Sequence, residues 1–541
     1  MPLESSILMP RFPRIRPAAI AALLIAVGAI RMASTFRVFS ATSDEATHIG
    51  AGLEIYQYHR YLFQRENPPL PRLVLAIAPY LGGMRYDNRG NFPEQIHSIF
   101  YGHGDYRANL VRARVGNIVF FVIAAVALFF TARDAIGEGA SLFALFLFTM
   151  EPVILGYSAV ATHDAAATAG VALALFAFTR WLRKPRLKSA LIFGAAFGFS
   201  ILCKFSCIPF VAVACLGIGM VRLLHDAELR GQVRRAAVTL VPAACATLVV
   251  VWAGYGFTVV TFGELQPWGP VFTPSIQRLL AQMNPRTPLP AANFFIGIAG
   301  LLRYDQRGYL TYLCGKILRS GRWWYFPFAI ALKTTIAALV LFATGILFAL
   351  RDRELRWAFA EWSVAAVAMI IVAMPSALDL GVRYLLPFYV PFAIAGACTV
   401  AAMLRASRTT AIVAIALLVA HAGASAFAHP DYFPYFNAFA GSDPSRYLVD
   451  SNIDWGQDIL RLRSVARHEH MEKLTVSLMG PADYVALGFP PIDLASPWTE
   501  SHGWVAVSDH SYRLTGAEGG WKWLPQNYRR VGKSIRLYRI P

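Results

Sequence analysis

Long apolar runs separated by polar connections dominate the pattern of this chain. A helix that crosses a bilayer needs about 20 mostly apolar residues, and only helices and closed barrels satisfy their backbone hydrogen bonds in lipid. The runs lack the alternation of apolar and polar residues that marks the strands of a membrane barrel. They therefore predict a polytopic α-helical membrane protein with about 11 transmembrane helices. The predicted spans are 17–36, 115–132, 138–150, 165–182, 189–203, 207–223, 236–255, 325–350, 358–375, 384–404 and 409–427.

The composition agrees with a membrane protein. Hydrophobic residues make up 56% of the chain and charged residues 15%, against about 25% charged residues in ordinary soluble domains. The formal net charge of +18 would indicate a nucleic-acid partner in a soluble protein. Here it has another explanation, because Lys and Arg concentrate in the cytoplasmic connections of membrane proteins. We therefore expect contacts with membrane lipids and no nucleic acid.

The basic residues are distributed unevenly between the two ends of the predicted spans. Arg11, Arg14 and Arg16 precede the first span, and further Lys and Arg residues lie in every second connection. The short connections between these hold little more than Lys204 and Arg383. This asymmetry predicts a multi-pass protein of the inner (plasma) membrane with a cytoplasmic N-terminus and an extracytoplasmic C-terminus. The first apolar run lacks a clear A-x-A cleavage site after it, so we expect a retained helix.

Three polar segments interrupt or follow the spans, and this topology places all three outside. Two are long outer loops, 37–114 and 256–323, and the third is the tail 430–541. The tail contains strand-like runs, so we expect residues 1–429 to form a transmembrane module and the tail a small α/β or α+β domain. The loops are rich in Trp, Tyr, Pro and Gly, and long ordered loops often hold function. The strand-like runs are KLTVSLM (473–479), GWVAVS (503–508) and SIRLYRI (534–540).

The first outer loop begins with an acidic pair, Asp44 and Glu45, followed by His48. A carboxylate beside low-dielectric protein is suited to act as a general base, because burial raises its pKa. The alternative is the solvated first turn of a helix capped by Ser43. Spacing alone does not decide between the two.

A second charged motif, Arg65-Glu66, stands just before the proline pair Pro68-Pro69. The double proline fixes the backbone and blocks a helix there, which would hold the charged pair in place. An ordinary loop breaker is the alternative interpretation of this motif.

Charged residues also stand at the outer ends of predicted spans. His163 and Asp164 precede one span, where they could cap the helix, although charged residues at membrane depth are rare and indicate function. Lys204 and Arg383 lie where the charge asymmetry does not favour cations, so they could extend to lipid headgroups or hold a phosphate. Because Asp44, Asp164, Lys204 and Arg383 share one membrane side, together they favour a functional site.

These motifs resemble the GT-C superfamily of glycosyltransferases that use lipid-linked sugars, and within it the protein O-mannosyltransferase and aminoarabinose transferase family. A histidine that is common before the proline pair in relatives is Asn67 here. Four further segments resemble a bacterial subgroup of this family. They are Gly321–Pro327, Lys333-Thr334, Tyr435-Phe436-Asn437 and Asp450–Asp458. The family motifs are matched by Asp44-Glu45, by Pro68-Pro69-Leu70, by Asp164 after Tyr157-Ser158, by Lys204-Phe205-Ser206 with Cys203 in place of Thr, and by Arg383–Pro387.

The resemblance implies a membrane glycosyltransferase that moves a sugar from a polyprenyl-phosphate donor to a hydroxyl of a protein, lipid or glycan acceptor, with inversion. Asp44 would be the general base, and Glu45 would orient or share that role. Asp164 would bind acceptor or donor sugar, while Lys204 and Arg383 would hold the donor phosphate.

The resemblance requires no cofactor, because phosphate is already a good leaving group. The candidate substrate-binding set also includes His48, Glu66 and His163, and these residues with His103 are the positions where a divalent metal could bind. The six cysteines form neither a disulfide framework nor a Cys/His zinc spacing.

The sequence alone is also compatible with two other functions. A transporter or flippase of lipid-linked sugars would place its ionisable residues near the bilayer midplane on broken helices, whereas here they cluster at outer ends. A membrane scaffold would leave the two large outer loops unexplained. The enzyme interpretation requires Asp44, Asp164, Lys204 and Arg383 to meet in one cavity, within about 15 Å of one another.

Overall fold

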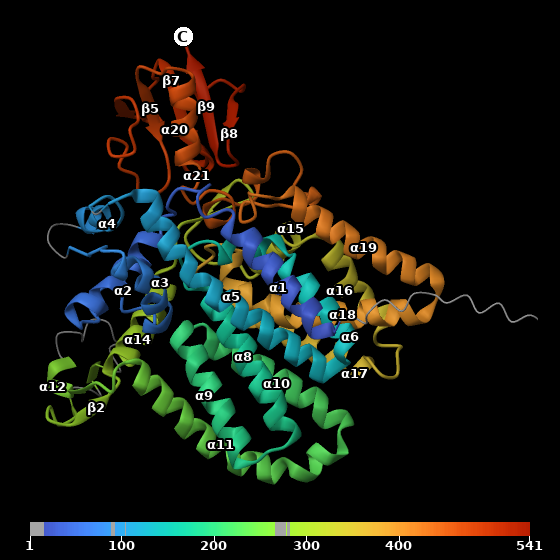
Figure 1. Ribbon diagram of the computed structural model, residues 1–541. Helices are drawn as coiled ribbons and strands as arrows, with labels where there is room; N and C mark the ends of the chain where they lie inside the picture. The colour runs from blue at the N-terminus through green and yellow to red at the C-terminus, as the bar shows by residue number, and fades with distance from the viewer. Residues whose placement is uncertain (1–15, 88–91, 103, 266–276, 279–281) are drawn as a thin grey trace, which may run out of the picture.

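The computed structural model is a bundle of helices with a small sheet domain (Figure 1) and describes residues 16–87, 92–102, 104–265, 277–278 and 282–541. Arg11, Arg14 and His103 lie outside the described residues. Twelve of the helices coincide with predicted spans. They are α1 (Pro17–Ala33), α5 (Tyr106–Ile136), α6 (Glu138–Thr149), α8 (Asp164–Arg183), α9 (Leu187–Cys203), α10 (Cys207–His225), α11 (Ala227–Gly254), α15 (Tyr325–Lys333), α16 (Ile336–Phe348), α17 (Arg356–Ala373), α18 (Tyr389–Ala406) and α19 (Arg408–Phe427).

The prediction of a polytopic helical membrane protein is confirmed, although the span count is lower. Within the described residues, seven helices are long and apolar enough to cross a membrane, and up to nine if each of two bent pairs counts as one span. The predicted spans 17–36 and 189–203 are the 17-residue helices α1 and α9. At about 1.5 Å per residue these are a few ångströms shorter than a bilayer core of about 30 Å.

The structure has a bend at two of the predicted spans. Span 138–150 matches α6 and ends at a 60° bend into α7 (Pro152–Ser158), whereas span 325–350 is broken into α15 and α16 with a 115° bend. The expectation of one continuous helix over 325–350 is therefore corrected. The break follows Lys333, whose buried ammonium donates hydrogen bonds to the carbonyls of Phe433 and Asn452, outside its own helix.

A buried polar triad joins the two breaks. Glu151 lies between α6 and α7, Thr335 lies between α15 and α16, and His421 lies on α19. The Thr335 hydroxyl is 3.3 Å from Glu151 Oε2 and 2.6 Å from His421 Nδ1, and all three side chains are buried. Because buried polar groups are costly without partners, this triad fixes how the two bent helix pairs meet.

The centre of the bundle consists of α8 and of α18 with η2 (Val382–Phe388), the short 3-10 helix that precedes it. Of their apolar windows, 83% and 94% respectively are buried, against 22% for α11 and 17% for α19. Asp164 is the first residue of α8 and Arg383 lies in η2. Each of the two most enclosed helical segments thus has a charged candidate residue in its first turn.

The first outer loop is largely helical. It contains α2 (Glu45–Tyr58), α3 (Pro69–Leu81) and α4 (Phe92–Tyr101), and α5 begins within it. The double proline begins a helix instead of only blocking one, because Pro69 occupies the first helical position, where a missing N–H is tolerated. The second outer loop contains β1 (Val259–Thr261), α12 (Phe262–Leu265), β2 (Pro288–Pro290), α14 (Ala292–Arg307), β3 (Thr311–Leu313) and β4 (Lys316–Leu318).

The tail forms the predicted α/β or α+β domain. Its sheet has the strand order β6-β5-β7-β9-β8, with β5 parallel to both β6 and β7 and the other pairs antiparallel. All three strand-like runs of the sequence are strands of this sheet. The elements are β5 (Leu474–Ser477), β6 (Ile492–Leu494), β7 (Gly503–Ser508), β8 (Arg529–Val531) and β9 (Ile535–Ile540), with α20 (Ile459–His468) and α21 (Asp509–Ala517), after the 3-10 turns η3 (Ala438–Ala440), η4 (Pro444–Arg446) and η5 (Asp450–Asn452).

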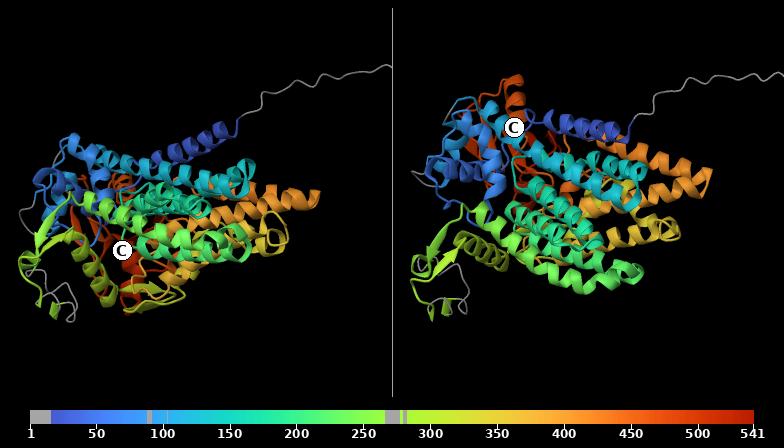
Figure 2. Two further views of the ribbon diagram at one scale, coloured as in Figure 1. Left: turned by 90° about the horizontal axis from the view of Figure 1, so that it is seen from below. Right: turned by 60° about the horizontal axis from the view of Figure 1, so that its bottom comes forward.

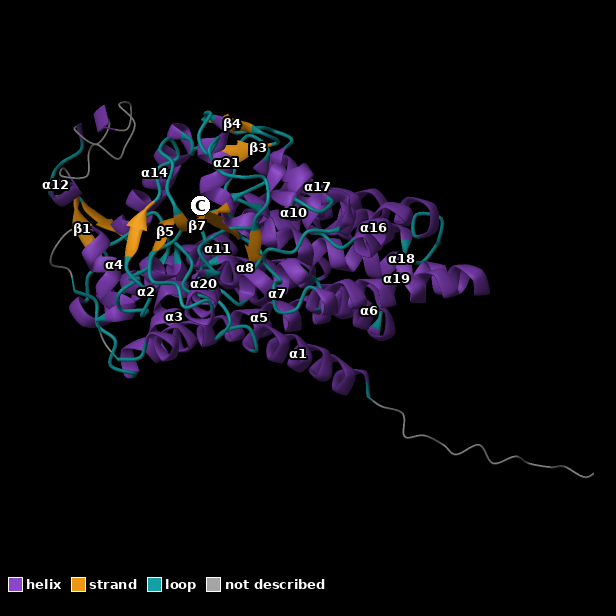
Figure 3. Cartoon of the chain, turned by 90° about the horizontal axis from the view of Figure 1, so that it is seen from above, coloured by secondary structure: helices purple, strands orange, loops and turns teal. Residues whose placement is uncertain are grey.

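The two loops predicted to lie outside and the tail gather at one end of the bundle. Figure 2 shows the long helices side by side, with α2–α4, the β1–β2 hairpin and the tail domain at the same end. Figure 3 shows the strands collected at this end, whereas α16, α18 and α19 extend away from it. This arrangement brings segments that are far apart in the sequence together above the ends of α8 and η2.

We predict that Thr335→Val destabilises the protein by about 1–3 kcal/mol, because it leaves Glu151 and His421 short of a partner inside the bundle. The measurement is thermal unfolding of the protein in detergent micelles. Thr344→Val, within α16 just after the break, is the matched control, because that hydroxyl donates to the carbonyl of Val340 in its own helix. Equal melting temperatures for the two variants would contradict the prediction.

Candidate active site

Arg383 is the centre of a cluster of charged side chains. Its Nη1 lies 3.0 Å from Asp44 Oδ2 and 3.5 Å from Asp164 Oδ2. The Arg383 side chain is only 5% exposed. One guanidinium thus links the acidic residue of the first outer loop with the first residue of α8.

Lys204 completes the cluster from the junction of α9 and α10. Its Nζ lies 2.6 Å from Asp164 Oδ1, and it sits 4.3 Å from the centre of the Tyr384 ring. The backbone is extended at Lys204, the residue that follows the last turn of α9, which turns this side chain inward from the helix end. The four residues predicted to meet therefore do meet, through direct contacts.

Asp44 differs from the other members of the cluster in its exposure. Its side chain is 37% exposed, whereas that of Asp164 is fully buried and that of Lys204 is 8% exposed. Burial by the surrounding protein raises the pKa of Asp44, Arg383 opposes this rise, and the carboxylates of Asp450 and Asp164 add to it. Asp44 is thus the group of the cluster that a molecule from outside reaches first.

Glu45, in contrast, is fully enclosed. Arg114 Nε donates to Glu45 Oε1 at 2.7 Å and Arg114 Nη2 donates to Oε2 at 2.8 Å. The backbone N–H groups of Thr42 and Ala161 donate to the same two oxygens. Of the two roles predicted for Glu45, orientation of its neighbour and sharing of the base role, these contacts favour orientation.

His48 and His163 stand beside the cluster. Their rings contact edge to face with centroids 4.5 Å apart, and His163 Nε2 is 3.8 Å from Asp164 Oδ1. Burial lowers the pKa of His48 to about 3, so its imidazole is neutral at physiological pH. The Nδ1 atoms of both rings are buried without a hydrogen-bond partner among the described residues. Both imidazoles therefore have hydrogen-bonding capacity to offer a ligand.

Glu66 lies apart from the ion pairs. It is exposed, and its Cγ stands beside Gly300 of α14. The loop that carries it is held by Arg72, which donates to the carbonyl of Phe63 at 3.0 Å, and by Glu54, which accepts from the N–H of Phe63 at 2.8 Å. Within the described part of the chain, no ion pair joins Glu66 to Lys204 or Arg383, the two cations of the cluster.

The structure adds residues that the site prediction did not include. Asp450 has a left-handed backbone (φ 56°), and its charge acts on both Asp44 and Arg383. The side chains of Ser451 and Trp455 contact Arg383 directly. The sequence placed all three in a family-like motif, but nothing in their spacing indicated which charged residue they approach.

In the described residues, no group of three or more His, Cys, Asp or Glu side chains could hold a metal ion. Of the four positions where a metal was considered, His48 and His163 contact one another, Glu66 lies apart, and His103 falls outside the described ranges.

A family model described as dolichyl-phosphate-mannose-protein mannosyltransferase matches residues 106–255. Among solved structures, ArnT from Cupriavidus metallidurans bound to undecaprenyl phosphate is similar over 96% of this chain and 98% of that chain, with 15% identity and a TM-score of 0.50. The resemblance to GT-C glycosyltransferases is confirmed. The family match also confirms the predicted enzyme class, and the likeness to ArnT confirms the fold.

Two further GT-C structures are more distant. The Pmt1-Pmt2 complex of S. cerevisiae bound to the sugar donor is 17% identical over 45% of this chain and 33% of that chain, with a TM-score of 0.33. AglB from Archaeoglobus fulgidus, in complex with an inhibitory peptide and a dolichol-phosphate, is 12% identical over 94% of this chain and 72% of that chain, with a TM-score of 0.46. No curated protein sequence matches the chain significantly. The fold assignment therefore depends on ArnT.

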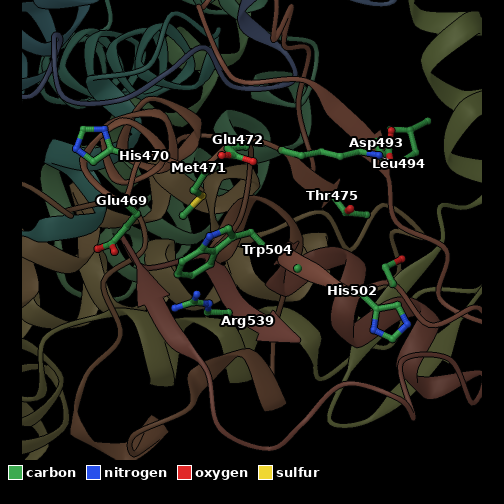
Figure 4. Close-up of a pocket in the computed structure, with 13 residues that line it drawn as sticks. Glu469, His470, Met471, Glu472, Thr475, Asp493, Leu494, His502, Trp504 and Arg539 are labelled. Carbon is green, nitrogen blue, oxygen red and sulfur yellow. Dashed lines mark ion pairs between the residues drawn. The ribbon is translucent and has the colours of Figure 1, made fainter. Parts of the chain in front are cut away.

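A separate cavity of about 820 Å³ lies on the tail domain, away from the charged cluster. Figure 4 shows Trp504 in its middle, with Glu469, Met471, Asp493 and His502 around it. An ion pair of 2.5 Å joins Lys473 to Asp493 at its edge. None of the predicted site residues lines this cavity, so the cluster around Arg383 is the candidate active site.

We predict that loss of charge at the two adjacent carboxylates has very different effects on stability. Glu45→Gln should destabilise the protein by about 3–5 kcal/mol, because it leaves the buried guanidinium of Arg114 without its counter-charge. Asp44→Asn should leave stability nearly unchanged, because Arg383 keeps Asp164 as partner. Thermal unfolding of the two purified isosteric variants measures the difference, and a stable Glu45→Gln protein would contradict the assignment of Glu45 as an orienting residue.

Proposed function

We propose that this protein transfers a sugar from a polyprenyl-phosphate donor to an acceptor hydroxyl on the extracytoplasmic side of the inner membrane, with Asp44 as general base. The observation that supports this proposal is the difference in solvent exposure between the side chains of the cluster. Asp44 is 37% exposed while its partners Arg383 and Asp164 are buried. An accessible carboxylate is thereby held beside enclosed cations, which is the arrangement that proton transfer and stabilisation of a leaving phosphate require.

In the proposed step the acceptor oxygen attacks the anomeric carbon of the donor sugar. The bond between that carbon and the phosphate oxygen breaks, and the electron pair leaves with the polyprenyl phosphate. The proton of the acceptor hydroxyl passes to Asp44. A single in-line displacement of this kind inverts the anomeric centre, and alignment of the two substrates supplies much of the rate.

The cations are suited to the leaving group. Lys204 has three N–H donors, and among the described residues its only hydrogen-bond acceptor is Asp164 Oδ1. Because the cluster of Asp44, Asp164, Lys204 and Arg383 is formally neutral, an incoming phosphate would compete with Asp164 for both cations. We infer that Asp164 keeps Lys204 and Arg383 in place until the donor enters, and that His48 and His163 contribute neutral hydrogen-bonding groups.

The sidedness of the reaction is part of the proposal. The uneven distribution of Lys and Arg supports an N-terminus in the cytoplasm. The tail and the first outer loop share one end of the bundle, since the N–H of Ser40 donates to the carbonyl of Gln457 at 2.9 Å. This supports an active site and a C-terminal domain that face the periplasm or cell exterior, where a lipid-linked sugar and a protein, lipid or glycan acceptor meet.

The alternative function is a transporter or flippase of lipid-linked sugars. One observation favours it, because bent helix pairs such as α6–α7 and α15–α16 are also found at the binding sites of transporters. The side chains at these breaks are however bound within the protein, as Thr335 is by Glu151 and His421. Transfer of radiolabelled sugar to an acceptor, as against movement of intact donor across liposomes, separates the two functions.

We predict that Asp44→Asn lowers the transfer rate about 10²–10⁴-fold, the contribution of a general base. The measurement is turnover of a polyprenyl-phosphate sugar by the purified protein. Asp105→Asn is the matched control in the same loop, because Asp105 caps α5 by accepting from the N–H of Ala108 and Asn caps helices equally well. Equal turnover by wild type and Asp44→Asn would remove Asp44 from the base role.

We predict that kcat/KM decreases at acidic pH because Asp44 becomes protonated, which gives the pH profile an acid limb. A base works when deprotonated, so the rate falls as the pH drops through its pKa, and burial places this pKa above the ordinary value of 3.8. His48 would give a limb at about 3. His48→Gln should therefore keep the position of the limb, and a limb that moves or disappears in this variant would indicate the imidazole instead.

A further inference from the structure

Three residues from the beginning of the tail are inserted into the charged cluster. Ser451 and Asn452 are fully buried and Trp455 is 1% exposed, although all three belong to the region that follows the last membrane helix. We call Ser451, Asn452 and Trp455 the tail clamp. Complete burial of two polar side chains requires hydrogen-bond partners, and these include Arg383 and its chain neighbours Leu380 and Val382.

The tail clamp holds the guanidinium of Arg383 from two directions. Arg383 Nε donates to Ser451 Oγ at 3.1 Å, and the guanidinium lies over the ring of Trp455 at 4.3 Å from its centre. The Ser451 hydroxyl donates in turn to the carbonyl of Leu380, so its own orientation is fixed. With Nε and one face of the guanidinium occupied, Nη1 is directed to Asp44 and Asp164.

The backbone around Arg383 is fitted to the tail clamp. Asn452 Oδ1 accepts from the N–H of Val382 at 3.1 Å. Gly381 has φ 126°, and a Cβ there would stand 2.4 Å from Ser451 Oγ, so both conformation and space require glycine. Lys333 donates to the carbonyl of Asn452 from the break between α15 and α16.

The tail clamp also reaches the base. The N–H of Ser43 donates to the carbonyl of Trp455 at 3.1 Å, immediately before Asp44 in the chain. Tyr157, which leads to Asp164, donates its hydroxyl proton to the carbonyl of Ser451 at 2.7 Å. The same few tail residues therefore touch the segments that carry Asp44, Asp164 and Arg383.

We infer that Ser451 and Trp455 are positioning residues for Arg383, so that the C-terminal region completes the donor-phosphate site. This inference rests on the proposed role of Arg383 in holding the donor phosphate. It assigns the beginning of the tail to the catalytic module and not to an independent outer domain.

The test compares Ser451→Ala with a matched serine. Ser445 is also a buried tail serine, and its hydroxyl accepts from Arg513 and Arg536 at 3.1 Å each, away from the cluster. Ser451→Ala should raise the KM for the donor about tenfold with a smaller change in kcat, since a hydrogen bond that orients a charged ligand-binding group is lost. Ser445→Ala should lower the melting temperature without changing the KM for the donor.

Trp455 supplies a second pair of variants. Trp455→Phe keeps an aromatic face for the guanidinium and should remain close to wild type, whereas Trp455→Leu should raise the donor KM as Ser451→Ala does. Thermal unfolding verifies that each variant is folded. Equal donor KM values for wild type, Ser451→Ala and Trp455→Leu would overturn the inference.

A binding measurement separates this inference from the proposed function. The probe is undecaprenyl phosphate in detergent micelles, with affinity measured for wild type, Ser451→Ala and Ser445→Ala. Binding by wild type without any sugar transfer would overturn the proposed function alone. Wild-type affinity in Ser451→Ala would overturn the positioning role alone, and no binding by wild type would overturn both.

Discussion

The site depends on one buried cation that is shared between two carboxylates. Arg383 stands between Asp44 and Asp164 at the outer end of the most enclosed helix of the bundle. A guanidinium in such a place is tolerated only with counter-charges and hydrogen bonds around it, because removing a charge from water is costly. The neighbouring elements are accordingly fitted to it: η2 supplies the arginine, α8 one carboxylate, the first outer loop the other, and the tail the remaining contacts.

A second buried ion pair supports the first. Arg114 on α5 binds both oxygens of Glu45 and also donates to the carbonyls of Phe36, Phe39 and Ser40. These contacts fix the chain on either side of Asp44 to a long membrane helix. The two acidic neighbours therefore differ in role. Glu45 is enclosed and anchors the loop, whereas Asp44 stays accessible to solvent.

Most helical spans could be predicted from the sequence because apolar composition decides membrane insertion. The charged residues at predicted outer helix ends could be identified because charges beside long apolar runs are rare. The break after Lys333 was missed, because the run around it is apolar enough to be interpreted as a single helix. Glu45 could not be told from Asp44, since only the distant Arg114 distinguishes them. Ser451 and Trp455 were not selected either, because their importance depends on a contact across 68 and more positions of the chain.

The position of the tail clamp near the end of the chain affects when the enzyme can become active. Synthesis proceeds from the N-terminus, and domains generally form in that order. Asp44 and Asp164 are therefore made long before Ser451 and Trp455. The helical bundle can be inserted while Arg383 still lacks the contacts that orient it. A chain that is interrupted before Ser451 would hold the membrane helices but would lack the contacts that orient Arg383, so the proposed donor-phosphate site is complete only after the tail has been made.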